Sequence, residues 1–232
     1  MRYDVVLFDI DDTLLDFQEA ERRALDKMLR HYALCTPLAE KTYRACNEAC
    51  WRALERGEID QATLRYKRFR DFLFMMNRAD DPKAVGDFYM NALSQEGVLL
   101  PGALEAVREI AARVKVGAVT NGIAFIQHGR LDASPIRPYL SALVISEEIG
   151  AAKPNPRILH QALKELGGVS PSRALLVGDS LASDMACARN AGVDGCWYNP
   201  GHKPRPADMP LAWEIDDLAQ LKDILEGTFP KI

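Results

Sequence analysis

The sequence predicts an α/β fold, a doubly wound parallel sheet with a helical subdomain inserted after its first strand. Two observations lead to this prediction. Short apolar segments alternate with segments of helical periodicity over most of the 232 residues, which is the pattern of strands joined by helical crossovers. One block, residues 17–96, carries helical periodicity only.

Five short apolar segments are typical of buried parallel strands, because they are rich in Val, Ile and Leu. They lie at residues 3–8, 114–119, 142–145, 174–177 and 195–198. Between them, apolar residues recur at helical spacing over 104–114 and 158–166, and Gly167 and Gly168 supply a stop signal for the second helix. These elements predict a parallel sheet with helices packed against it.

The block at 17–96 is too long for a simple crossover between two strands. We expect it to form a helical cap, inserted into a core made of residues 1–16 and 97–232. A Pro-rich loop at 200–210 is expected to cover one edge of this core.

The composition is that of an ordinary globular protein, with 48% hydrophobic and 27% charged residues and a formal net charge of −4. Because nucleic-acid binding usually needs a basic surface, this charge argues against a nucleic-acid partner. No apolar run approaches the roughly 18 residues of a membrane span, and no signal-peptide pattern opens the chain, so we expect a cytoplasmic protein without a membrane partner. The five cysteines lack Cys-x-x-Cys spacing, and Cys46 and Cys50 are expected to be small core residues.

Two carboxylates stand where the first predicted strand ends. Asp9 and Asp11 follow the apolar run 5–8, and carboxylates are costly there if they are buried and unpaired. An open α/β sheet keeps its ligand site outside the carboxyl ends of its strands. A bound cation would offset the charge and leave one carboxylate free for chemistry, although the pair alone is also compatible with a solvated turn.

The other predicted strand ends place further polar groups on the same edge of the sheet. They are, in chain order, Thr120, Asn121, Gly122, Lys153, Asp179 and Asp184. Most of them have an ordinary interpretation when taken alone: 120–122 is a turn signal, Lys153 a solvent-facing residue, and Asp184 an exposed acid in the first turn of a helix.

Together the set suits phosphoryl transfer. The carboxylates of Asp9 and Asp179 are hard oxygen ligands of the kind that Mg²⁺ prefers. Thr120 and the backbone amides of the two residues after it are suited to hold phosphoryl oxygens, and Lys153 to neutralise their charge. A nucleophilic Asp would divide the reaction into two steps by way of an aspartyl-phosphate.

The motifs Asp-x-Asp-x-Thr at 9–13, Thr120, Lys153 and Gly-Asp-x4-Asp at 178–184 stand in the order found in the haloacid dehalogenase superfamily. The chain resembles that superfamily over almost its whole length. The resemblance implies a Rossmann-like core with a helical cap after the first strand, where the 17–96 block lies. It also implies that Thr120 and Lys153 bind phosphate.

The resemblance assigns roles to the four carboxylates as well. Asp9 would be the nucleophile, and Asp11 the general acid and base. Mg²⁺ would be bound by the carboxylates of Asp9 and Asp179 and by the backbone carbonyl of Asp11, with Asp184 binding through water or orienting its neighbours. A second acid at position 11 favours phosphate-ester hydrolysis over dehalogenation, because a halide leaves without a proton.

A narrower resemblance links the chain to the bacterial pyrimidine 5′-nucleotidases that act on abnormal nucleotides. It rests on Trp51 and 57–59 in the cap and on 100–103, 119–122, 143–150, 153–155 and 196–199 in the core. It implies a small phosphorylated substrate, a pyrimidine nucleoside 5′-monophosphate such as dUMP, dTMP or UMP. The alternatives are a sugar-phosphate phosphatase or mutase of the same superfamily and, more remotely, a non-catalytic binding protein. A monomer and a homodimer are both compatible with the sequence.

Two features of the cap have alternative interpretations. The segment 64–70 carries four cations, which could be a solvated helix face or a basic flank that attracts anionic nucleotides. Trp51, Tyr66 and Phe69 could stack on a pyrimidine ring or belong to the cap core.

Overall fold

The computed structural model describes residues 1–206 and 211–230. Its centre is a six-stranded parallel sheet in the order β3-β2-β1-β4-β5-β6. The strands are β1 (Val5–Phe8), β2 (Lys115–Thr120), β3 (Ala142–Ile145), β4 (Ala174–Gly178), β5 (Asp194–Tyr198) and β6 (Trp213–Ile215). The predicted parallel sheet is confirmed, with all five expected strands present; β6 is an additional edge strand that the sequence did not indicate.

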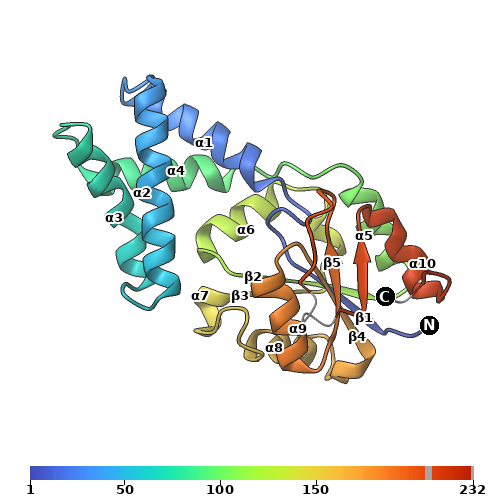
Figure 1. Ribbon diagram of the computed structural model, residues 1–232. Helices are drawn as coiled ribbons and strands as arrows, with labels where there is room; N and C mark the ends of the chain where they lie inside the picture. The colour runs from blue at the N-terminus through green and yellow to red at the C-terminus, as the bar shows by residue number, and fades with distance from the viewer. Residues whose placement is uncertain (207–210, 231–232) are drawn as a thin grey trace.

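Helices cover both faces of this sheet (Figure 1). Val6 and Phe8 of β1 pack on one face with α5 (Ala103–Ala111) and α10 (Leu221–Glu226). Val5 and Leu7 pack on the other face with α8 (Arg157–Glu165) and α9 (Ala186–Ala191). Because alternate residues of a strand point to opposite faces, an entirely apolar strand such as β1 belongs between two helical layers.

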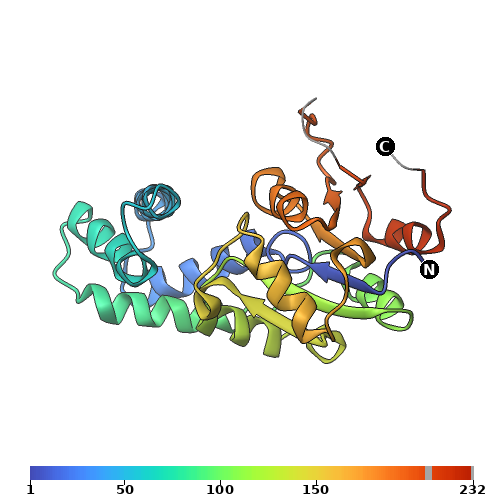
Figure 2. The same cartoon turned by 90° about the horizontal axis from the view of Figure 1, so that it is seen from below.

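Four helices lie between β1 and β2 in the sequence and gather at one side of the molecule, away from most of the sheet (Figures 1 and 2). They are α1 (Phe17–His31), α2 (Pro37–Glu55), α3 (Gln61–Met75) and α4 (Pro82–Ser94). Each begins at a Thr or Asp whose side chain accepts a hydrogen bond from a first-turn amide, as N-cap residues do. We call these four helices the cap; the domain boundaries at 17–96 stay a prediction.

The cap has an apolar core of its own, to which all four helices contribute. Cys46 and Cys50 are buried in it as free thiols, so the prediction that these two are small core residues is confirmed. Ile126 of α6 (Ala124–Asp132), a helix that follows β2, also packs into this core. Helix α6 therefore joins the cap to the sheet.

The remaining helical elements are short. They are α7 (Ser146–Ile149), 3-10 turns at Arg137–Tyr139, Pro171–Arg173 and Leu218–Gln220, and a π-helical turn at Leu181–Met185. In the described part of the loop at 200–210, residues 201–206 are exposed; residues 207–210 of that loop lie outside the described residues. None of the described helices combines the length and apolar character needed to cross a membrane.

Candidate active site

Strand β1 lies at the point where the sheet order reverses, with β2 and β3 on one side and β4, β5 and β6 on the other. The crevice outside the carboxyl end of such a strand is the usual ligand site of a doubly wound sheet. Asp9 is the first residue after β1 and is only 7% exposed. Its backbone amide donates to the Val177 carbonyl at 2.8 Å, which fixes the chain where the crevice opens.

Lys153 lies between two buried carboxylates. Its ammonium contacts the Asp9 carboxylate, lies 2.7 Å from Asp184 Oδ1, and donates to the Val119 carbonyl at 3.1 Å. Burial alone would lower the pKa of Lys153, but the negative charges of Asp184 and Asp9 raise it above its ordinary value. Lys153 is therefore a buried cation in direct contact with Asp9.

The side chain of Asn121 holds the backbone of Lys153 in place. Its amide nitrogen donates to the Lys153 carbonyl at 2.8 Å, and its oxygen accepts from the Lys153 amide at 2.7 Å. These paired bonds tie the loop after β3 to the end of β2. Asn121 thus positions Lys153 through its side chain, a contact that the turn signal at 120–122 did not indicate.

Three carboxylates form a cluster that fits a hard divalent cation. Oxygens of Asp9, Asp179 and Asp184 lie within 4.8 Å of one another. Burial raises the pKa of Asp9 well above its ordinary value, and burial together with the charge of Asp184 raises the pKa of Asp179 to about 7. Such shifts indicate negative charge that the surrounding protein groups leave incompletely balanced, and oxygen ligands of this kind suit Mg²⁺.

Gly178 permits the close approach of Asp184 to this cluster. A Cβ atom at position 178 would lie 2.4 Å from Asp184 Cγ, which no side chain could tolerate without moving Asp184. The Asp184 carboxylate also accepts from the Ser180 amide at 3.0 Å and is 1% exposed. The interpretation of Asp184 as an exposed helix acid is therefore wrong, and so is that of Lys153, 6% exposed, as a solvent-facing residue.

Two residues of α6 bind the Asp11 side chain. Arg130, which is fully buried, forms an ion pair with Asp11 Oδ1. The Gln127 amide nitrogen donates to Asp11 Oδ2 at 2.7 Å and to Thr120 Oγ1 at 3.0 Å. The sequence motifs did not indicate Gln127 and Arg130 as partners of Asp11. The available signal was a cation three residues after a glutamine, in the segment that follows Thr120.

Asp12 adopts a backbone conformation that glycine prefers. Its φ angle is +58°, which lies in the left-handed region that Asp tolerates better than most residues. The Asp12 carboxylate accepts from the Phe17 amide at 3.2 Å. This bond lies where the chain leaves the core for α1.

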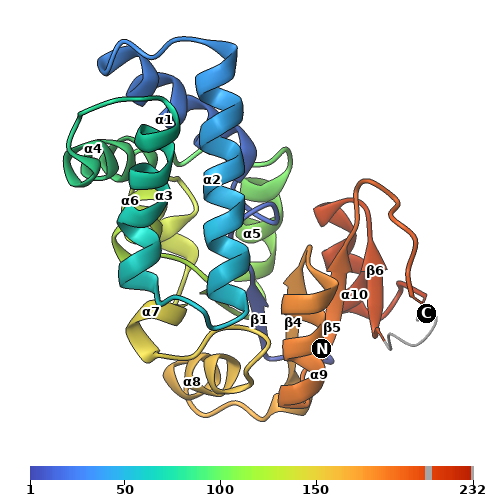
Figure 3. The same cartoon turned by 60° about the vertical axis from the view of Figure 1, so that its left-hand side comes forward.

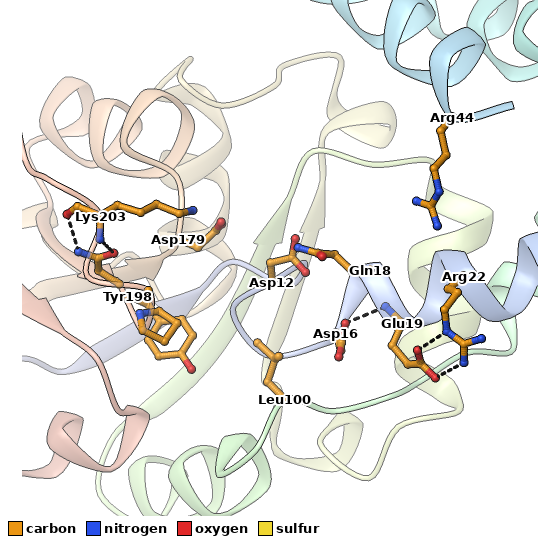
Figure 4. Close-up of a pocket in the computed structure, with 13 residues that line it drawn as sticks. Asp12, Asp16, Gln18, Glu19, Arg22, Arg44, Leu100, Asp179, Tyr198 and Lys203 are labelled. Carbon is orange, nitrogen blue, oxygen red and sulfur yellow. Dashed lines mark hydrogen bonds and ion pairs between the residues drawn. The ribbon is translucent and has the colours of Figure 1, made fainter. Parts of the chain in front are cut away.

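Two clefts open beside the acidic cluster. The first, the Asp179 cleft, has a volume of about 740 Å³ and is lined by Asp12, Asp179, Tyr198, Lys203 and Arg44 among others. Figure 4 shows Asp12 near its middle, with Lys203 on one side and Arg44 of α2 on the other.

The second cleft, the Trp51 cleft, has a volume of about 800 Å³ and lies between the cap and the core. Trp51 and Leu54 of α2 line its cap side, and Asn121, Ser146 and Lys153 line its core side. Figure 3 shows α2 running toward α8 and this end of the sheet.

The strand ends thus bring Asp9, Thr120, Lys153, Asp179 and Asp184 to one edge of the sheet, as the sequence predicts. Asp11 joins them through Gln127, which also contacts Thr120. Gly122 lies beside Gln127, where a Cβ atom would approach Gln127 Nε2 to 2.7 Å. The chemical roles of these residues remain predictions.

Comparison with known proteins identifies the family. The sequence model of the haloacid dehalogenase-like hydrolases matches residues 3–192. The chain is 33% identical to the pyrimidine 5′-nucleotidase YjjG of Escherichia coli, over 97% of this chain and 99% of that protein. It is also 33% identical to the pyrimidine 5′-nucleotidase PynA of Streptococcus pneumoniae, over 97% of this chain and 96% of that protein. It is also 33% identical to a glyceraldehyde 3-phosphate phosphatase of Methanopyrus kandleri, over 95% and 96%.

Solved structures agree with this assignment. A magnesium-bound crystal structure of the putative hydrolase YfnB from Bacillus subtilis, described with an interdomain movement, superposes with a TM-score of 0.87 at 30% identity, covering 97% of this chain and 99% of the other. The resemblance to the haloacid dehalogenase superfamily is thereby confirmed, and with it the Rossmann-like core. The chain belongs to the haloacid dehalogenase-like hydrolase family.

Proposed function

We propose that this hydrolase is a Mg²⁺-dependent phosphomonoesterase that removes the 5′-phosphate from pyrimidine nucleoside monophosphates such as dUMP, dTMP and UMP. The observation that supports the phosphatase chemistry is the buried contact of the Lys153 ammonium with Asp9, beside the cluster of Asp9, Asp179 and Asp184. The nucleotide substrate is supported by the similarity to YjjG and PynA.

In the first step, an Asp9 carboxylate oxygen attacks phosphorus, and the bond from phosphorus to the sugar 5′ oxygen breaks. Asp11 gives a proton to that leaving oxygen. Lys153 and the Thr120 hydroxyl hold the phosphoryl oxygens while charge develops on them. Gln127 and Arg130 fix the orientation in which Asp11 meets the leaving group.

In the second step, Asp11 takes a proton from a water molecule, whose oxygen attacks phosphorus of the aspartyl-phosphate. The bond between phosphorus and the Asp9 oxygen breaks, so that inorganic phosphate is released and the Asp9 carboxylate is restored. The same carboxyl group therefore acts first as an acid and then as a base, which returns the enzyme to its starting protonation.

Asp9 and Asp179 would hold Mg²⁺ through their carboxylates and Asp11 through its backbone carbonyl, with Asp184 behind them. The donor set fits this ion because every contributing atom is an oxygen. When bound, Mg²⁺ would screen the Asp9 carboxylate from the phosphate dianion and neutralise charge in the transition state. Cytoplasmic location and a monomeric or homodimeric state stay predictions.

Phosphate release from a panel of esters tests the proposal. The panel contains UMP, dUMP, dTMP, AMP, GMP, ribose 5-phosphate and glyceraldehyde 3-phosphate, each assayed with Mg²⁺ and with EDTA. We expect release to need Mg²⁺, to recover when Mg²⁺ is restored, and to show the highest kcat/KM for the pyrimidine nucleotides. A preference for the sugar phosphates would replace the substrate and keep the chemistry, whereas no release from any ester would refute the enzymatic proposal.

A further inference from the structure

Only one of the three cap aromatics considered as stacking surfaces faces the cleft between the cap and the core. Phe69 is fully buried and packs against Tyr43 and Tyr89 inside the cap. The Tyr66 hydroxyl donates to Asp87 at 3.0 Å, within the cap. Trp51 is partly exposed and lines the cleft together with Lys153, so its indole is available to a molecule bound there.

Ser146 supplies a polar group on the opposite wall of this cleft. It follows β3 directly, lines the cleft and is only 4% exposed. Among the residues that the structure describes, its hydroxyl has no hydrogen-bond partner. A buried hydroxyl without a partner costs free energy. Rotation of the Ser146 side chain about χ1 would turn this hydroxyl into the cleft, where a ligand with a polar edge would satisfy it.

From these two walls we propose that the Trp51 cleft binds the nucleoside part of the substrate, with the Trp51 indole stacked on the base and the Ser146 hydroxyl bonded to a polar group of the nucleoside. The inference rests on the proposed nucleotidase function. A base has an apolar face and polar edges, and the cleft offers one wall of each kind. Its volume of about 800 Å³ lies within the ordinary range of small-molecule sites.

The Asp179 cleft is a poorer place for the nucleoside. Its wall carries the carboxylates of Asp12, Asp16 and Glu19 together with the cations of Arg22, Arg44 and Lys203, and it does not include Lys153 or Asn121. When the phosphate of a nucleotide is bound at Lys153, its nucleoside can extend directly into the Trp51 cleft, because Lys153 itself lines that cleft.

An ion pair connects the cap to the core next to Ser146. Arg65 of α3 lies 2.8 Å from Glu147, the residue after Ser146. Glu147 also accepts from the Ala124 amide at the start of α6 at 2.7 Å. Glu147, the neighbour of Ser146, therefore links α3 of the cap to the start of α6 in the core.

Substrate discrimination tests the assignment, with UMP compared against ribose 5-phosphate, which lacks the base. For Trp51→Ala we expect kcat/KM for UMP to fall about tenfold or more, as for the loss of a stacking aromatic, while kcat/KM for ribose 5-phosphate stays within about twofold. Trp51→Phe should keep most of the UMP activity. Ser146→Ala should lower kcat/KM for UMP several-fold without lowering the unfolding midpoint, because no protein partner is lost.

Phe74→Ala is the matched control, since Phe74 is a cap aromatic that is 84% exposed, and it should leave both substrates unchanged. Intrinsic fluorescence gives a readout independent of turnover, because Trp197 and Trp213 are 2% and 3% exposed and Trp51 is the accessible tryptophan. In Mg²⁺-free protein, UMP should quench this fluorescence and ribose 5-phosphate should not. Trp51→Phe should abolish the quenching.

The outcomes separate the inference from the function. Suppose that the wild-type enzyme prefers UMP. If Trp51→Ala then lowers activity equally on both substrates, or leaves both unchanged, the cleft assignment is overturned and the nucleotidase proposal stands. Quenching by UMP that persists in Trp51→Phe would overturn it as well. Wild-type enzyme that hydrolyses no nucleotide would overturn both.

Discussion

The ion pair between Arg130 and Asp11 makes an asymmetric prediction about stability. Arg130 is fully buried, whereas the Asp11 side chain is 26% exposed. Asp11→Asn leaves a cation in the protein interior without its counter-charge. Arg130→Met leaves a carboxylate that water can reach. We therefore expect Asp11→Asn to destabilise the protein more than Arg130→Met.

The magnitude follows from what each partner retains. Breaking a buried pair by removing one charge costs about 3–5 kcal/mol. Arg130 keeps a hydrogen bond to the Glu96 carbonyl at 3.2 Å and lies 5.4 Å from the centre of the Phe17 ring, so the loss for Asp11→Asn should be near the lower value. At about 2–4 °C per kcal/mol for a chain of this size, the unfolding midpoint should fall by about 6–12 °C. For Arg130→Met, where water replaces the lost partner and Met fills much of the volume, we expect about 1 kcal/mol.

Thermal unfolding followed by circular dichroism measures the two midpoints, with Arg70→Met as the control, because Arg70 is 65% exposed and pairs with Asp71 at the surface. Phosphate release measures the second consequence: Arg130→Met should lower kcat about 10²-fold through misplacement of Asp11, with little change in KM. If Asp11→Asn unfolds at the wild-type temperature, or if Arg130→Met is the less stable variant, the argument from buried charge is wrong.

Three further substitutions test the core of the site. Asp9→Asn should abolish phosphate release at an unchanged unfolding midpoint, because Lys153 keeps Asp184 at 2.7 Å; full activity would exclude the covalent mechanism. Lys153→Ala should lower kcat about 10²-fold and lower the unfolding midpoint, since Asp9 and Asp184 then face each other without a cation; a variant with wild-type kcat would remove Lys153 from catalysis. Gly178→Ala would place a Cβ 2.4 Å from Asp184 Cγ, so half-maximal activity should need more Mg²⁺, and an unchanged Mg²⁺ titration would show that Asp184 does not support the metal site.

The core of the site was predictable because strand ends fix it. Residues that follow the carboxyl ends of neighbouring parallel strands must meet at one edge, so Asp9, Thr120 and Asp179 come together whatever the side chains around them do. Helix α6 was missed for the opposite reason. Its segment, 124–132, contains Gly129 and several polar residues, so its apolar periodicity is weak, and with it the partners of Asp11 were missed. Strand β6 is only three residues long, too short for an alternation to be visible.

The basic segment at 64–70 shows why a charge pattern on a helix did not decide function. Arg65 of the cap pairs with Glu147 of the core, Lys67 pairs with Asp71, and Arg68 is buried with a hydrogen bond to Asn47 at 2.8 Å. Four like charges in sequence therefore have different environments. Neither a solvated face nor a uniform basic flank describes them, because Arg65 meets the core, Arg68 is buried, and Lys67 and Arg70 share Asp71 at the surface.

For the cap aromatics too, the sequence pattern alone did not decide which residue contacts the substrate. Trp51, Tyr66 and Phe69 all stand on amphipathic helices, and helical periodicity alone gives each an equal claim to the cap core and to the cleft. Packing between helices separates them. Phe69 of α3 packs against Tyr89 of α4, whereas Trp51 lies near the end of α2 and lines the cleft that Lys153 also lines. Catalytic groups fixed by strand ends can thus be inferred from sequence, but recognition groups fixed by helix packing need the structure. If Trp51 has no effect on UMP, the Asp179 cleft is the next surface to test for recognition, because its wall carries the aromatic side chain of Tyr198.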